Sequence, residues 1–204
     1  MLRIQDLASA RARRMYASGD LRAYLLSDLV RRVLERHKVR MVVYQDALCP
    51  DAGALNLRPP EHVGPPPAVD VTIGSVSFDE PIIPVREIVD AGLDPLAVRL
   101  VFLEHHYRDP LVLDWDALRD AHQALVLWRT QVARWAESAS KPMHDGYVRR
   151  AEAAFDDDLH TPTALRALRE LEQDASVEPG SKFESFLHLD HVLALDLSVD
   201  IGRN

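Results

Sequence analysis

The chain has 204 residues, 47% of them hydrophobic and 27% charged, which is typical of one large globular domain or two small ones. It contains no run of about 18 apolar residues and no apolar leader at its start, so neither a membrane span nor a signal peptide is predicted. The formal net charge of −8 argues against tight non-specific binding to nucleic acid, and the single cysteine, Cys49, excludes an internal disulfide and leads us to expect a cytoplasmic protein.

A helix and a strand are the first regular elements that the sequence predicts with clear signals. Residues 19–38 place leucines, valines and a tyrosine at helical spacing with arginines between them. The stretch RMVVYQ at 40–45 is short, apolar and β-branched, which indicates a buried strand. A helix followed so closely by a strand predicts part of an α/β unit.

A proline-rich stretch over residues 46–69 interrupts this pattern. Proline fixes φ and removes a backbone donor, so we expect a long loop with polyproline-like pieces. Such a loop is unusual inside a compact domain, which suggests a deletion or a junction between parts. Residues 69–78 then predict a short strand pair around Gly74.

From residue 84 the sequence predicts helices to its end, with start and stop signals between them. The expected limits are a short helix closed by Gly92, a helix from Asp94-Pro95 to 109, a helix begun by Asp114 and ended at Lys141-Pro142, a helix over 145–156, a helix begun by Thr161-Pro162, a break at 178–181, and a last helix from Phe183 to Leu195. We therefore expect a cut-down α/β part over 1–83 and a mainly α-helical bundle over 84–204.

Several stretches of the sequence, taken in order, carry a resemblance to a known family. They are LRIQDLASAR, RRMYASG and LRAYLLSDLVRRVLERHKVRMVVYQD, then VREIVDAGLDPLAVRLVFLEHHYRDPLVLDWDALRDAHQAL, then AFDDDLHTPTALRALREL and FLHLDHVLALDL. Together they resemble the cysteinyl-tRNA synthetases and the related mycothiol-pathway cysteine ligases. The resemblance implies a remnant of the Rossmann-like nucleotide-binding fold of class I synthetases, followed by the family's helical, stem-contact bundle.

The resemblance also implies a chemistry, but the sequence motifs that carry this chemistry in the family are not found in this sequence. The family forms an aminoacyl adenylate with a HIGH motif, a KMSKS loop and a zinc ion that binds the substrate thiol. In the matching positions, Ser18 replaces the first zinc-ligand cysteine, SGD at 18–20 or the neighbouring GDLRAY replaces HIGH, and GSVSF at 74–78 replaces KMSKS. The other zinc ligands would fall within 46–69, where Cys49 has no second cysteine. The resemblance thus indicates a truncated, motif-degenerate paralogue.

The remnant pocket of the nucleotide-binding part is the candidate site, with no catalytic residue assigned. No zinc or other metal is expected, and ATP is a candidate ligand only if this pocket functions. The residues that would line the pocket are Tyr16, Ser18, Asp20, Tyr24, Tyr44 and Asp46. The same residues also suit core and rim packing. Asp20 at a phosphate site would repel ATP.

Three consecutive aspartates at 156–158 end one predicted helix just before the next begins. Their carboxylates, with Thr161, are expected to cap the following helix rather than to bind a metal, because consecutive helical residues point about 100° apart. The pair His188 and His191 has a spacing that can bind metal on a helix, and Cys49 could be a nucleophile, but we expect ordinary surface and loop roles for all three.

Three functions are compatible with this sequence. The first is a non-catalytic binding or accessory protein that docks to a protein partner or forms a homodimer, through the bundle or through an open sheet edge. The second is a repurposed enzyme of a biosynthetic pathway that transfers or ligates an aminoacyl or acyl group, with Asp20 or Asp46 as acid or base. The third is a tRNA-binding module, which the net charge disfavours although 11–14 and 31–40 are rich in arginine.

Overall fold

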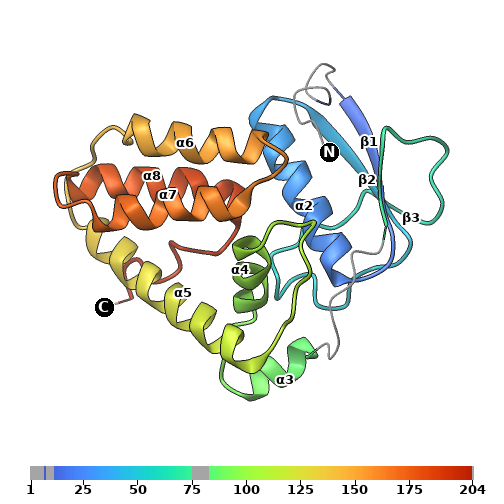
Figure 1. Ribbon diagram of the computed structural model, residues 1–204, viewed down its shortest axis with the longest axis horizontal. Helices are drawn as coiled ribbons and strands as arrows, with labels where there is room; N and C mark the ends of the chain where they lie inside the picture. The colour runs from blue at the N-terminus through green and yellow to red at the C-terminus, as the bar shows by residue number, and fades with distance from the viewer. Residues whose placement is uncertain (1–6, 8–11, 75–82, 204) are drawn as a thin grey trace.

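The computed structural model describes Leu7, residues 12–74 and residues 83–203. In chain order the elements are β1 (Ala12–Ala17), α2 (Leu21–Arg36), β2 (Arg40–Gln45), β3 (His62–Val63), β4 (Val71–Ile73), α3 (Val85–Asp90), α4 (Leu96–Glu104), α5 (Trp115–Trp135), α6 (Asp145–Asp156), α7 (Thr161–Gln173) and α8 (Pro179–Leu193). The predicted fold class, an α/β part followed by a helical bundle, is confirmed (Figure 1).

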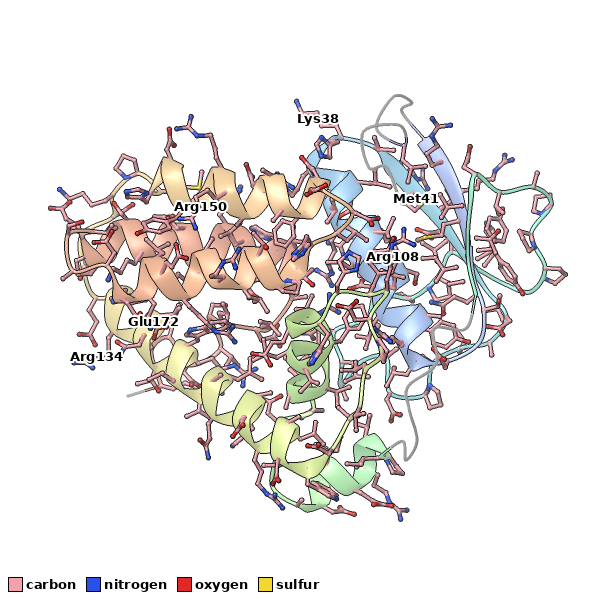
Figure 2. The ribbon with its side chains drawn as sticks, viewed as in Figure 1. Lys38, Met41, Arg108, Arg134, Arg150 and Glu172 are labelled. Atoms are coloured by element: carbon pink, nitrogen blue, oxygen red, sulfur yellow. The ribbon has the colours of Figure 1, made fainter. Side chains whose placement is uncertain are left out.

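The sheet is four-stranded and parallel, in the order β3-β2-β1-β4. Side chains alternate across a strand, so Met15 of β1 and Met41 and Val43 of β2 share one face, which is buried. The helix α2 covers this face, and Figure 2 shows Met41 between β2 and α2. The small sheet thus obtains its core from a single helix.

Local signals explain the limits of α2 and β2. Asp20 is extended and its carboxylate accepts a hydrogen bond from the N–H of Ala23 at 3.0 Å, which begins the helix. The helix ends at Arg36, and Lys38 takes a left-handed conformation (φ 59°) that turns the chain into β2. The predicted helix over 19–38 and strand over 40–45 are both confirmed.

The proline-rich stretch makes the crossover between the two edge strands of the sheet. From β3 to β4 the chain must cross three strand spacings, about 14 Å, with only residues 64–70 between the strands. A seven-residue α-helix would span only about 10 Å, whereas a polyproline segment rises about 3.1 Å per residue. In Figure 1 this segment arcs out on the side of the sheet opposite α2, where a doubly wound fold would carry a helix.

The bundle follows the predicted start signals closely at several helices. Asp114 accepts a hydrogen bond from the N–H of Ala117 at 2.8 Å and begins α5, and Gly92 closes the α3 turn with φ 77°. The helix predicted over 145–156 is α6. α6 packs along α7, α5 packs against α4, and α8 contacts α2, α5, α6 and α7.

Several helix limits differ from the prediction. α5 ends at Trp135, before the predicted end at Lys141-Pro142, and α8 ends at Leu193 rather than Leu195. α4 ends at Glu104 rather than 109, because Arg22 of α2 donates hydrogen bonds to the carbonyls of His106 and Asp109, at 3.3 and 2.6 Å, and holds that segment outside a helix. The predicted break at 178–181 is wrong, since α8 begins at Pro179. Proline suits the first turn of a helix, and Gly180 is there because a Cβ would lie 2.1 Å from the carbonyl oxygen of Ala139.

A buried group of charged side chains joins the α/β part to the bundle, and we call Asp28, Arg32, Arg99 and Arg129 the arginine hub. Arg99 of α4 is 1% exposed and donates to Asp28 Oδ2 at 2.7 Å, to the carbonyl of Leu193 at 2.6 Å and to that of Leu55 at 3.3 Å. The other two arginines bind the carbonyls of Asn56, His191, Leu195 and Asp196. Carbonyl groups at the end of α8 are thereby satisfied by side chains of α2, α4 and α5.

The expectation that the three aspartates cap α7 is wrong. The N-cap of α7 is His160, with no side-chain cap bond. Asp156 instead accepts from His37 at 2.8 Å, and Asp158 accepts from the Tyr107 hydroxyl at 2.7 Å and from two nitrogens of Arg108 at 3.0 and 3.2 Å. Asp156 and Asp158 thus have a structural role, as expected, but they fulfil it by binding residues far away in the sequence rather than by capping α7.

Some predictions fall outside the described residues. The opening strand and turn predicted within 2–11 are described only at Leu7, and the strand pair around Gly74 is described only as β4, a parallel neighbour of β1. The domain limit at 83/84 adjoins residues 75–82, so it stays a prediction. No helix among the described residues is long and apolar enough to cross a membrane.

Candidate functional site

The carboxyl ends of the strands bring three chain segments together. β1 ends at Ala17, and the next residue, Ser18, donates its N–H to the carbonyl of Ile73 at the end of β4, at 3.0 Å. Asp46 follows β2 and donates its N–H to the carbonyl of Ala17 at 3.4 Å. Ligands of open parallel sheets bind outside this edge, so we call Ser18, Gly19, Asp20, Tyr24 and Asp46 the strand-end site.

Asp46 is the centre of the strand-end site. Its carboxylate accepts from the Tyr24 hydroxyl at 2.7 Å, from the N–H of Gly19 at 3.1 Å and from the N–H of Ala47 at 3.1 Å. Gly19 has φ 117°, a backbone conformation that is strained for any residue with a side chain. The turn from β1 into α2 therefore depends on this glycine. The carboxylate therefore fastens the turn to the end of β2.

A second carboxylate occupies the amino end of α2. Asp20 caps the helix through the N–H of Ala23, as described above. Backbone N–H groups at such a turn are what class I nucleotide-binding folds offer to phosphate. Here those of Gly19 and Ala23 already bind carboxylates, and both carboxylates add negative charge to the turn.

The hydrogen bond between Tyr24 and Asp46 changes the protonation of both groups. Burial, and then the bond and the charge of Asp46, raise the pKa of Tyr24 to about 12. Donation by Tyr24, against a smaller opposing effect of burial, lowers the pKa of Asp46, with help from the N–H groups of Gly19 and Ala47. At neutral pH the pair is thus a phenol and a carboxylate, a weak acid beside a weak base.

The structure brings together four of the six residues expected in the pocket and separates two. Tyr16 and Tyr44 are opposite each other on β1 and β2, on the face that points away from α2. Tyr44 stacks there on His62 with 4.7 Å between ring centroids. Ser18, Asp20, Tyr24 and Asp46 gather at the carboxyl ends of the strands. Tyr16 and Tyr44 lie within the strands, on the sheet face opposite α2, and do not join them.

Curated proteins with two cysteine-ligase names are similar to this chain. A cysteine–tRNA ligase of Novosphingobium aromaticivorans is 33% identical over 116 residues, covering 54% of this chain and 24% of that protein. An L-cysteine:1D-myo-inositol 2-amino-2-deoxy-alpha-D-glucopyranoside ligase of Thermobifida fusca is 41% identical over 88 residues, covering 42% and 20%. A cysteine–tRNA ligase of Nitrosomonas eutropha is 33% identical over 113 residues, covering 50% and 24%.

The chain is a homologue of the cysteine ligases. No protein-family model matches it. The matched stretch spans about a fifth to a quarter of these relatives' own length, at 20–24%. The activities in their names therefore belong to proteins much longer than the matched part.

The strand-end site of this cysteine-ligase homologue does not fit the zinc ion that the resemblance implies. Structural and catalytic zinc takes thiolates, imidazoles and carboxylates in a tetrahedron. Ser18 offers a hydroxyl, and the Asp46 oxygens already accept from Tyr24 and two N–H groups. Within 12–74 and 83–203, no three His, Cys, Asp or Glu side chains come together as metal ligands would.

Two features of the homologue were not found from the sequence. Cys49 is a half-buried thiol whose pKa burial raises, and it lies close enough to Tyr24 for its charge to affect that phenol. Spacing within ALCPD could not show this. The second feature is the N–H of Gly19, which donates to Asp46. The sequence did contain a signal for it, since a glycine before an aspartate cap is typical of a strand-to-helix turn.

A separate hollow of about 580 Å³ lies beside the arginine hub, between α2, residues 53–59 and the end of α8. Its polar lining comes from Arg32, Asn56, Arg58, Asp190, His191, Asp196 and Ser198. His191 therefore faces this hollow, whereas His188 bonds Glu152 of α6 at 2.9 Å. The two histidines of HLDH thus have different surroundings and do not act as a pair.

Proposed function

We propose that this cysteine-ligase homologue does not activate cysteine and works as a binding or accessory protein. One observation supports the proposal most strongly. The turn between β1 and α2, which would have to receive ATP phosphates, is closed by the carboxylates of Asp20 and Asp46. Phosphate brought to that turn would displace two hydrogen bonds and meet two negative charges.

The protonation of the strand-end site argues against the repurposed enzyme. A general acid or base works best with a pKa near the working pH. The pKa of Tyr24 is raised to about 12, and that of Asp46 is lowered. Neither group is poised to exchange a proton at neutral pH.

Arginine pairing argues against the tRNA-binding module. Three of the four arginines in the stretch 31–40 pair within the chain: Arg31 with Glu61 at 2.6 Å, Arg32 with Asp28 at 2.8 Å and Arg36 with Glu152 at 3.0 Å. Arginines that are already paired with carboxylates release few counterions from nucleic acid, so they add little to its binding. The net charge of −8 opposes binding further.

Pyrophosphate exchange with ATP and cysteine tests the proposal, with a full-length cysteine–tRNA ligase as the positive control. We expect no exchange above background, with or without added zinc. A thermal-shift titration with a non-hydrolysable cysteinyl adenylate and with ATP is the second readout. A ligand at about 100 times its Kd adds roughly 2.7 kcal/mol, which would raise Tm by several degrees at this size.

No shift in a folded protein agrees with the proposal, and cysteine-dependent exchange would refute it. Metal analysis of the purified protein belongs with this test, since we expect no stoichiometric zinc.

The partner is a second protein or a second copy of the chain. In the described sheet β3 and β4 each have one neighbouring strand, so their outer edges are open to pairing. Sedimentation over a range of concentrations distinguishes the two occupants, because a homodimer dissociates on dilution and a monomer does not change.

A further inference from the structure

The hollow beside the arginine hub is large enough to hold a small molecule or a long side chain. Its volume of about 580 Å³ lies within the range of about 300–1,000 Å³ that ligand pockets occupy. Its walls come from Arg32 of α2, from residues 53–59, and from the end of α8 with the turn that follows it. The hollow shares no residue with the strand-end site, so a ligand bound here is additional to the partner proposed above.

Two carboxylates of the lining have no cationic partner. Asp190 accepts the N–H groups of Leu195 and Leu197, at 2.8 and 2.9 Å, and the side chain of Asp196 makes no hydrogen bond within the described part of the chain. Neither carboxylate forms an ion pair there. Burial, and then the charge of Asp196, raise the pKa of Asp190, against the two N–H groups and the charge of Arg99. Buried charges in proteins are normally paired, so the hollow offers two carboxylates to a cation.

The arginines of the same lining are already paired. Arg32 binds Asp28 at 2.8 Å, and Arg58 binds Glu35. Their positive charges are therefore neutralised by other carboxylates of the chain, and they leave the charge of Asp196 uncompensated.

The end of α8 adds to the preference for a cation. The carboxyl end of this 15-residue helix adjoins the hollow at His191 and Ala194, and a helix carries partial negative charge at that end. Leu57, Pro59 and Leu187 supply apolar lining. An apolar wall beside a charged group suits an alkyl chain that ends in a charge.

We propose that the hollow binds an alkylammonium group, with the ammonium at Asp190 and Asp196 and the alkyl chain against Leu57 and Leu187. An ammonium group has three donors and no acceptor. An ionised carboxylate offers about four lone-pair sites, and Asp190 uses two of them for backbone N–H groups. Two sources carry this chemistry: a free aliphatic amine and the side chain of a lysine on a partner protein.

NMR titration of the ¹⁵N-labelled chain with cadaverine, an aliphatic diamine, tests the proposal. The N–H groups of Leu195 and Leu197 bind Asp190, so their signals report on the hollow directly. We expect saturable shifts of both signals with cadaverine and none with 1-pentanol, a neutral molecule whose alkyl chain has the same length. Asp196→Asn should bind cadaverine about tenfold more weakly, and asparagine tolerates the φ of 52° at this position. Asp120→Asn, at an exposed carboxylate of α5 outside the hollow, is the matched control and should bind as the parent does.

A peptide with a single lysine, acetyl-Gly-Lys-Gly-amide, distinguishes the two sources. If the peptide shifts the same signals and its Nε-acetylated form does not, the ligand is a lysine of a protein partner; if only cadaverine does so, the ligand is a free amine. Either result supports the proposal, whereas no shift with either probe overturns it.

An Asp196→Asn variant that binds cadaverine as tightly as the parent also overturns the proposal. If that variant melts early, Ser198→Lys takes its place, because a lysine at the lining brings a competing ammonium and should weaken binding by a similar factor. Unchanged binding by this second variant contradicts the proposal equally. Pyrophosphate exchange reports on the proposed function separately, so either proposal can fail alone.

Discussion

The arginine hub and the strand-end site are both built from charged groups that hold backbone atoms, yet they lie in different surroundings. Asp28 and Arg99 of the hub are 4% and 1% exposed, whereas Asp46 is on the surface. In the hub Asp28, Arg99 and Arg129 are buried, so a partner that is removed there is not readily replaced by water. At the strand ends water can replace a lost partner. The same kinds of bond are therefore needed for stability in the hub, whereas at the strand ends they can be changed with little loss of stability.

The largest effect is expected from Arg99→Met. It removes the buried donor of the carbonyls of Leu55 and Leu193 and one of the two arginine partners of Asp28, which keeps only Arg32. We expect a loss of about 3–5 kcal/mol in the free energy of unfolding, measured by urea denaturation. Arg86→Met, at a side chain 87% exposed, is the control and should cost almost nothing. A loss below about 1 kcal/mol for Arg99→Met would show that the hub is dispensable.

Acid should weaken the hub through Asp28. Burial alone would raise the pKa of Asp28, but Arg99 and Arg32 outweigh it and lower that pKa. A depressed folded pKa means that the stabilisation is complete above the unfolded value, about 3.9, and is lost as pH falls through the folded value. The difference in unfolding free energy between the parent and Asp28→Asn should thus shrink below about pH 4. A constant difference would contradict this.

Gly180→Ala tests close packing without charge. The added Cβ would lie 2.1 Å from the carbonyl oxygen of Ala139, which is backbone and cannot turn aside. We expect a loss of about 1–3 kcal/mol, measured by thermal and urea unfolding. Gly53→Ala, with nothing within 4 Å of its Cβ, is the matched control. Equal stability of both variants would mean that α8 begins differently.

The aspartate run offers a matched pair of neighbouring carboxylates. Asp158 binds Tyr107 and Arg108, whereas Asp157 is exposed at the end of α6. Asp158→Ala should cost about 1–2 kcal/mol and Asp157→Ala much less, in the same urea assay. If both variants cost the same, capping by the run as a whole, rather than the single long-range contact, would explain its presence.

The smallest effect on stability is expected at the strand-end site, where spectroscopy is the sharper probe. The neutral phenol of Tyr24 is favoured in the folded state, so its contribution is present below pH 10 and lost as pH rises to about 12. Asp46→Asn should lower this pKa without returning it to its ordinary value, because burial remains. Alkaline titration of phenolate absorbance measures it, and Tyr24→Phe identifies the signal. An unchanged pKa would show that Asp46 does not act on Tyr24.

Elements with signals inside their own sequence were predictable. Asp114 begins α5 as expected, and the limits of β2 and α6 agree with the prediction. What failed depends on residues far away in the chain: α4 ends early because of Arg22, and the aspartate run contacts His37 and Tyr107 rather than α7. A single sequence does not contain those pairings.

The candidate site shows the same division. Ser18, Asp20, Tyr24 and Asp46 meet because the ends of parallel strands share one edge, which strand assignment alone predicts. Tyr16 and Tyr44 do not join them, and strand alternation could have shown this, since both lie one position away from the core-facing residues of their strands. The crossover was recognised as a loop, but its route over the sheet depends on the strand order, which the sequence did not reveal.

The arginine hub also sets an order of events during synthesis. It joins Asp28, Leu55, Arg99 and Leu193, which are spread over most of the chain. Contacts so distant in sequence form slowly, and on a ribosome they cannot form until the last helix has emerged. Until then Arg99 lacks the carbonyl of Leu193, and α2 lacks its contact with α8. The packing of α2 is therefore complete only after α8 has been made.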